Sequence, residues 1–140
     1  MEARIKWVEN ALFTGETGSG HAIAIDGPAD IGGKNLGPRP MELMLLSVGS
    51  CSAVDVVHIL KKARQPVSDV VVAVKGVRAD TDPKVFTEIH LQFTVTGKGL
   101  APNQVERAVK LSAEKYCSAS IMCSRAGAKV THGVEIKETP

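Results

Sequence analysis

The longest apolar segment of this 140-residue chain runs from Met41 to Leu60 and reads MELMLLSVGSCSAVDVVHIL. Pro40 stands directly before it, where a helix tolerates the missing backbone N–H group. From Met41 to Arg64 the sequence has no proline and a single glycine, so we expect one long helix. Its first half is apolar on nearly all sides, which is typical of a helix that is buried over most of its surface.

A small sheet from the same chain covers such a helix only in part. We therefore expect a second copy of the chain to complete the burial, and we predict an obligate homodimer. Glu42, Asp55 and His58 interrupt the segment, which makes it a poor transmembrane helix. We expect no membrane partner.

The residues before the helix predict three short strands in a meander, at Ala3–Trp7, Ala11–Phe13 and Ala22–Ile25. The segment Asp26–Pro40 holds four glycines and three prolines, and we expect it to have no regular structure. Loops of this length often border functional sites, and a plain connector is an equally good interpretation.

The residues after the helix predict a valine-rich strand at Val67–Val77 and an antiparallel alternating strand at Val85–Val95. Asn103 followed by Glu106 indicates the start of a further helix. We expect one face of it to carry Val105, Ala108, Val109, Ser112 and Tyr116. A second helical segment, 117–126, and an alternating strand, 130–136, follow. The order predicts a single α+β domain over residues 1–140 with mainly antiparallel sheet.

The composition excludes several classes of protein. Hydrophobic residues make up 44% and charged residues 23% of the chain, which is ordinary for a globular protein. A net charge of +2 and 4% aromatic residues argue against nucleic acid as a partner. The N-terminus has no apolar signal core, so we expect a cytoplasmic protein whose three cysteines are free thiols.

Cys51, Asp55 and His58 are spaced i, i+4 and i+7, so they share one face of the expected helix. This polar stripe indicates either a site or a solvated C-terminal half of the helix. All three residue types bind zinc, but seven residues span roughly 10 Å along a helix. We therefore expect no bound metal and no cofactor.

The other two cysteines differ in their surroundings. Cys117 follows Lys115 and opens the expected second helical segment, and both features would lower the pKa of its thiol. On local grounds alone Cys117 is thus a candidate nucleophile. Cys123 stands beside Ile121 and Met122, and we expect it to pack as a small core residue.

Two motifs carry a resemblance to a known family. GPRPMELMLLSVGSC, residues 37–51, and EKYC, residues 114–117, occur in this order. Together they resemble the OsmC/Ohr family, the osmotically inducible and organic hydroperoxide resistance proteins. The resemblance implies mainly antiparallel sheets around a long central helix in an intertwined homodimer. It also implies thiol-dependent reduction of organic hydroperoxides during oxidative stress.

The resemblance implies roles for four residues. Cys51 matches the peroxidatic cysteine and Cys117 the resolving one, with a disulfide between them that a dithiol or small thiol reduces. The family places an arginine beside the thiolate and orients it with a glutamate. Arg39, within the first motif, is the nearest cation before Cys51 in sequence, with Arg4 and Lys34 as alternatives, and Glu42 is the candidate glutamate.

This sequence departs from the family pattern at two positions. The family glutamate directly follows the proline of the first motif, where this chain has Met41, and the second cysteine precedes Ser118 instead of proline. Three hypotheses therefore stay open: a peroxidase, a non-catalytic protein that binds a small ligand or senses redox state, and a metal-dependent enzyme. For the first, an apolar pocket from Leu43, Met44, Val48 and a partner chain would favour organic peroxides.

Overall fold

The computed structural model describes all 140 residues. Its contacts divide the chain into two compact units, Met1–Met44 and Leu45–Pro140. Each unit contains a three-stranded sheet of its own. The expectation of a single domain over residues 1–140 stays a prediction.

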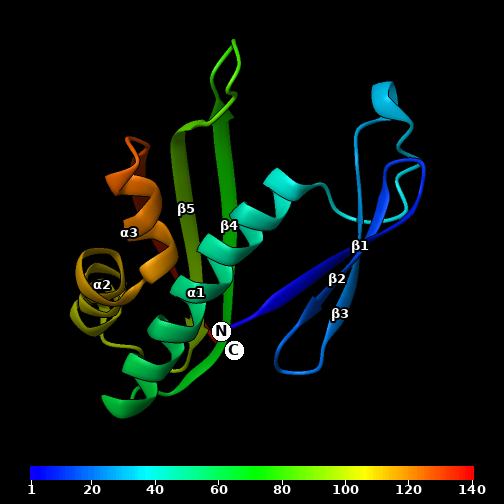
Figure 1. Cartoon of the computed structure of the whole chain (residues 1–140). Helices are drawn as coiled ribbons and strands as arrows, with labels where there is room; N and C mark the ends of the chain where they lie inside the picture. The colour runs from blue at the N-terminus through cyan, green and yellow to red at the C-terminus, as the bar shows by residue number, and fades with distance from the viewer. The chain divides into compact units, whose positions relative to one another are not determined.

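The first unit is built on the meander that the sequence predicts. Strands β1 (Ala3–Glu9), β2 (Leu12–Thr17) and β3 (Ala22–Asp26) pair antiparallel in the order β1-β2-β3 (Figure 1). Every residue of β1 is exposed, including Ile5 at 61% and Trp7 at 62%. This sheet therefore has large apolar side chains that its own unit does not cover.

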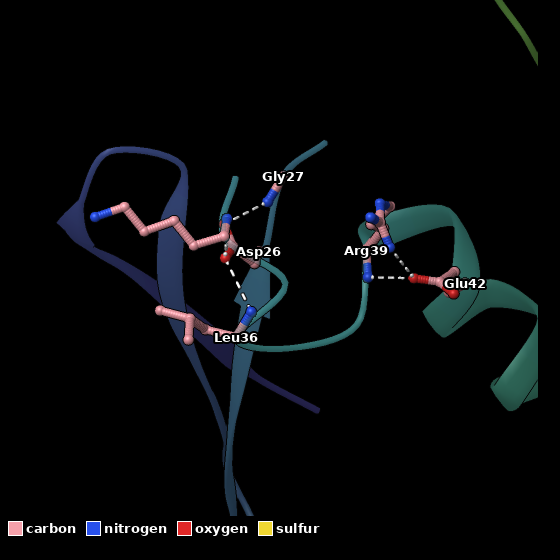
Figure 2. A network of polar contacts seen from close by, with 6 residues as sticks. Asp26, Gly27, Leu36, Arg39 and Glu42 are labelled. Atoms are coloured by element: carbon pink, nitrogen blue, oxygen red, sulfur yellow. Dashed lines mark hydrogen bonds and ion pairs between the residues drawn. The ribbon is translucent and has the colours of Figure 1, made fainter. Parts of the chain in front are cut away.

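The long loop after β3 is organised by one carboxylate. Asp26 is 2% exposed and accepts N–H groups from Gly27, Lys34 and Leu36 at 2.9, 3.0 and 3.1 Å (Figure 2). These backbone donors, Lys34 foremost, hold the pKa of Asp26 below its ordinary value. The loop also contains a short 3-10 helix, η1 (Ala29–Ile31), so the expectation of no regular structure was wrong. The hydrogen bonds from these three backbone N–H groups to one carboxylate hold the glycine-rich loop in place.

The long helix predicted from Pro40 onward is confirmed as α1 (Pro40–Lys62). Gly49 lies where α1 approaches the second unit's sheet, and a Cβ there would be 2.8 Å from a methyl of Val74. Glycine is thus required for this close approach. Val48, Val56 and Leu60 enter the core on the same side of the helix.

The second unit holds a mixed sheet in the order β4-β5-β6. Strands β4 (Val67–Arg78) and β5 (Phe86–Gly97) are antiparallel, as expected, whereas β6 (Lys129–Glu138) pairs with β5 in parallel. A parallel pair needs a crossover connection. Helices α2 (Pro102–Leu111) and α3 (Ser118–Arg125) provide it (Figure 1).

The core of this unit forms along β5. Its inward side chains are the alternate residues Ile89, Leu91, Phe93 and Val95, each at most 1% exposed. They pack against residues of α1 and α2. The alternation in the sequence therefore identified the buried face of this strand correctly.

Two details of the crossover differ from expectation. Helix α2 begins at Pro102 with Ala101 as its N-cap, so Asn103 does not cap it; proline is preorganised for the first helical position. Between α2 and α3 the chain forms a π-helix, η2 (Ser112–Tyr116). This wider turn shifts the following residues round the axis, so Ser112 is buried while Tyr116 is 49% exposed. The expected common face thus ends at Ser112.

By length and composition alone, α1 is apolar enough to cross a membrane, with a mean hydropathy of 1.8. Helices at the core of soluble proteins pass the same test, and five residues of α1 are buried in this fold. Only 28% of its apolar window is buried, however, and Leu46 and Val54 are exposed. The single chain thus leaves part of its most apolar helix uncovered.

Candidate functional site

Three side chains of the second unit that carry reactive or ligating atoms meet at one point. The thiols of Cys51 and Cys117 and a carboxylate oxygen of Asp55 all lie within 4.8 Å of one another. Cys51 and Asp55 are one turn apart on α1, while Cys117 stands between η2 and α3. The π-turn places Cys117 here: its N–H donates to the Ser112 carbonyl five residues back, at 2.8 Å. The cysteines are 66 positions apart in sequence, yet the fold brings them together.

Cys117 is fully buried, at 0% exposure. Its thiol lies 3.8 Å from the Val48 carbonyl, to which it donates. Burial, and to a lesser extent the neighbouring Cys51, raises the pKa of the Cys117 thiol. The expectation of a lowered pKa was therefore wrong. Cys117 is the N-cap of α3, as expected, but the loss of solvent around the thiol raises its pKa more than the helix end lowers it. The ammonium group of Lys115 lies over the ring of Tyr116, 5.3 Å from its centre.

A chain of hydroxyl groups connects this cluster to the crossover. The Ser112 hydroxyl donates to Asp55 Oδ2 at 3.0 Å and lies 2.9 Å from the Ser52 hydroxyl. Ser52 and Ser112 are both fully buried. The two serines fix the carboxylate of Asp55 beside the thiols. The sequence predicted Ser112 on the buried face of its helix but indicated no functional role for it or for Ser52, because isolated serines in helices carry no distinctive pattern.

A pocket of about 590 Å³ opens beside Asp55. It is lined by Asp55, His58, Ile59, Lys62, Ala63, Arg107, Leu111 and Tyr116. The C-terminal part of the polar stripe on α1 thus lines a cavity, with two cations and several apolar side chains around it. Val48 is not part of a pocket wall: it is 1% exposed and belongs to the core, so that element of the expected apolar pocket was wrong.

Arg39 and Glu42 pair with each other in the first unit. The backbone N–H of Arg39 donates to Glu42 Oε1 at 2.8 Å, and its guanidinium reaches the same oxygen at 3.3 Å (Figure 2). The N–H bond, followed by the guanidinium bond, lowers the pKa of Glu42. The pair closes the first turn of α1, and its role beside the Cys51 thiolate stays a prediction.

Cys123 and His58 lie outside the thiol cluster. Cys123 is partly buried and packs against the core, and burial raises the pKa of its thiol. His58 is exposed at the pocket rim. The cluster of potential metal ligands contains Cys117 in place of His58, a combination that the sequence spacing did not reveal.

These features define an α+β protein with a close pair of thiols, one partly exposed and one buried. Comparison with known proteins agrees with this class. A family model described as OsmC-like protein matches residues 32–133. The chain belongs to the OsmC family.

Relatives cover nearly the whole chain. Protein YhfA of Escherichia coli (strain K12) is 48% identical over 136 residues, which are 97% of this chain and 98% of the relative. A solved structure of a hypothetical protein from Aquifex aeolicus VF5 is 36% identical with a TM-score of 0.86, over 99% of this chain and 97% of that one. The names of these two proteins state no activity.

More distant structures share the fold. An organic hydroperoxide resistance protein OsmC from Legionella pneumophila, described as a predicted redox protein, has a TM-score of 0.69 and 21% identity. The match covers 96% of this chain and 95% of that one. This similarity shows the shared fold, and the expected mixed fold is confirmed.

Proposed function

We propose that this protein is a cysteine-based peroxidase that reduces organic hydroperoxides to alcohols. The observation that carries the proposal is the approach of the Cys51 and Cys117 thiols to within 4.8 Å. A disulfide, whose S–S bond is about 2.05 Å long, would form once rotation of the two side chains brings the sulfurs closer together. Cys51 is partly exposed and accessible to a small molecule, whereas Cys117 is shielded.

The proposed reaction has three steps. The Cys51 thiolate attacks one oxygen of the O–O bond, which breaks; the alkoxide leaves as an alcohol after taking a proton, and Cys51 becomes a sulfenic acid. The Cys117 sulfur then attacks the Cys51 sulfur and expels water, which forms a disulfide. A dithiol or small thiol reduces this bond by exchange and is itself oxidised.

The environment of Cys117 supports its assignment as the resolving residue. A thiol is a poor nucleophile while it stays protonated, and burial raises the pKa of Cys117. Its proton is held toward the Val48 carbonyl. Peroxide also needs access, which the fully buried Cys117 does not offer.

Asp55 has a place in the second step. When Cys117 attacks the sulfenic acid, its proton needs an acceptor within the buried cluster. The Asp55 carboxylate is within 4.8 Å of both sulfurs, and Ser112 holds it in position. We assign Asp55 as the group that takes this proton and delivers it to the departing hydroxide.

A second candidate function has one observation in its favour. The pocket beside Asp55 combines Lys62 and Arg107 with apolar walls, which suits a small anionic or amphipathic ligand. Met41 also stands where the family enzymes have glutamate. A non-catalytic protein would bind such a ligand and use its thiols only as a redox sensor.

The test is the consumption of cumene hydroperoxide by the reduced full-length chain with dithiothreitol as reductant. The peroxidase predicts turnover, faster than with hydrogen peroxide, and peptide mapping of the oxidised protein should find Cys51 linked to Cys117. Stoichiometric oxidation without turnover would support the sensor instead. A disulfide between Cys117 and Cys123 would contradict the assignment of the two reactive thiols.

We also propose that the protein works as a homodimer. Large apolar side chains are exposed on each unit, Ile5 and Trp7 on β1 and Leu46 and Val54 on α1, and a second copy of the chain would remove them from water. Sedimentation equilibrium should find twice the chain mass of 14.8 kDa. A folded monomer at micromolar concentration would contradict this proposal.

A further inference from the structure

The meeting of two thiols and a carboxylate is also the ligand set of a metal site. Two ligand atoms on one tetrahedral zinc ion lie roughly 3.6–3.8 Å apart, given Zn–S and Zn–O bonds of about 2.3 and 2.1 Å. The Sγ atoms of Cys51 and Cys117 and an oxygen of Asp55 all lie within 4.8 Å of one another. Side-chain adjustments well below one ångström per ligand would bring all three onto one ion.

The surroundings of Asp55 match those of a zinc ligand. Ligating carboxylates are usually held by hydrogen bonds from residues behind them. The buried Ser112 hydroxyl donates to Asp55 Oδ2, and Ser52 supports Ser112 in turn. One face of the carboxylate is therefore fixed by the protein.

A cation would also balance the charge that the cluster acquires when its thiols ionise. Neither ion pair in the structure, Arg4–Glu16 or Arg39–Glu42, involves Asp55. Two thiolates and one carboxylate would carry three negative charges, and a dication removes most of their mutual repulsion. Asp55 also lines the neighbouring pocket, so one of the three ligands is next to a space that can hold water.

We propose that Cys51, Asp55 and Cys117 bind one Zn²⁺ ion in the reduced protein. Binding releases the thiol protons to solvent, and water is expected to complete the coordination as the fourth ligand. A Cys51–Cys117 disulfide removes two of the three ligands, so metal and disulfide exclude each other. That zinc would also protect the thiols from peroxide rests on the proposed peroxidase function; the binding itself does not.

The experiment titrates the reduced, chelator-treated full-length chain with Zn²⁺ against a chromophoric chelator, and with Co²⁺ as an optical probe. We expect one equivalent to bind, with thiolate-to-cobalt charge-transfer absorption and the visible bands of a tetrahedral ion. Cys51→Ser and Cys117→Ser should each remove most of the charge-transfer intensity. The protein oxidised to the Cys51–Cys117 disulfide should bind no metal.

Three further variants test the assignment of the individual ligands. Asp55→Asn should weaken binding, and Ser112→Ala should do so by about 10–100-fold, because it frees the carboxylate without removing a ligand. Cys123→Ser, which removes a thiol outside the cluster, should leave the titration unchanged. Either no binding in the folded, reduced chain or a loss of binding in Cys123→Ser would overturn the proposal.

Separate measurements distinguish the zinc site from the peroxidase activity. Binding is read from absorbance without peroxide, so a chain that turns over hydroperoxide but binds no zinc contradicts the metal site alone. A chain that binds zinc through these three residues but consumes no hydroperoxide supports the site and contradicts the peroxidase.

Discussion

The middle of α1 and the junction between η2 and α3 each present one cysteine to the same point, in opposite settings. Cys51 stands on a regular helix and is partly exposed, whereas Cys117 stands at a helix break and is completely buried. The Cys117 thiol also donates to a main-chain carbonyl. The comparison shows that two neighbouring thiols in one fold can differ widely in exposure: Cys51 is accessible to solvent and Cys117 is not.

This contrast is sharpest in the expected behaviour of serine variants. Cys51→Ser should abolish hydroperoxide consumption, because the remaining thiol near the site is buried and protonated. Cys117→Ser should consume about one equivalent and stop with Cys51 as sulfenic acid or a higher oxide. A single-turnover assay with a sulfenic-acid probe and peptide mapping measures both. If Cys51→Ser still consumes an equivalent and the label appears on Cys117, the roles are reversed.

The second largest expected effect is a difference between the rates at which the two thiols react with an alkylating reagent. In the native reduced protein, an alkylating reagent should modify Cys51 at least about tenfold faster than Cys117, which reacts only when the structure opens. Time-resolved mass mapping gives the rate for each site. Cys123, partly buried and outside the cluster, is the internal reference. Equal rates for Cys51 and Cys117 would remove the basis of the comparison.

A smaller effect is expected from the hydroxyl that joins the two regions. Ser112→Ala leaves Asp55 and Ser52 without a buried partner and should reduce the free energy of unfolding by about 1–3 kcal/mol. Urea unfolding measures this change. The control is Ser118→Ala at an exposed position of α3, which should stay within about 0.5 kcal/mol of the parent. If Ser112→Ala leaves the free energy of unfolding unchanged, the hydrogen bonds of Ser112 to Asp55 and Ser52 do not stabilise the fold.

The smallest effect is a pH dependence. The pKa of Cys117 is raised above 9.0 in the folded chain, so above about pH 9 the unfolded state loses this proton first. The unfolded state then binds fewer protons, and stability present below pH 9 falls as pH rises toward the folded pKa. Urea midpoints between about pH 8 and about pH 10 should decline less steeply in Cys117→Ala. In Cys51→Ser, where Cys117 is still present, the decline of stability with pH that Cys117 causes should remain.

Much of the fold was predictable because it rests on local patterns. The run from Pro40 gave α1, and the alternation from Ile89 to Val95 gave the buried face of β5. The parallel pairing of β6 was not predicted, since an alternating strand reads the same in either direction. The π-turn was also missed, because residues 112–116 fit an ordinary helix equally well.

The site was predictable only in part, because its properties depend on distant residues. The resemblance to a family identified Cys51 and Cys117, and the structure brings them together. The direction of the Cys117 pKa was wrong because the sequence showed Lys115 nearby but not the burial that dominates. Asp55 stood out in the helical stripe, but its partner Ser112 comes from 57 residues further on.

The π-turn lets Ser112 contact both regions, through its backbone carbonyl and through its side chain. The Ser112 carbonyl accepts the Cys117 N–H at 2.8 Å, while its hydroxyl contacts Asp55 and Ser52 on α1. The Cys117 amide thus lies in the same short segment as the thiol pair. We expect its resonance in a ¹⁵N-labelled sample to shift when Cys51 and Cys117 become linked, which would follow the state of the thiols without an attached dye.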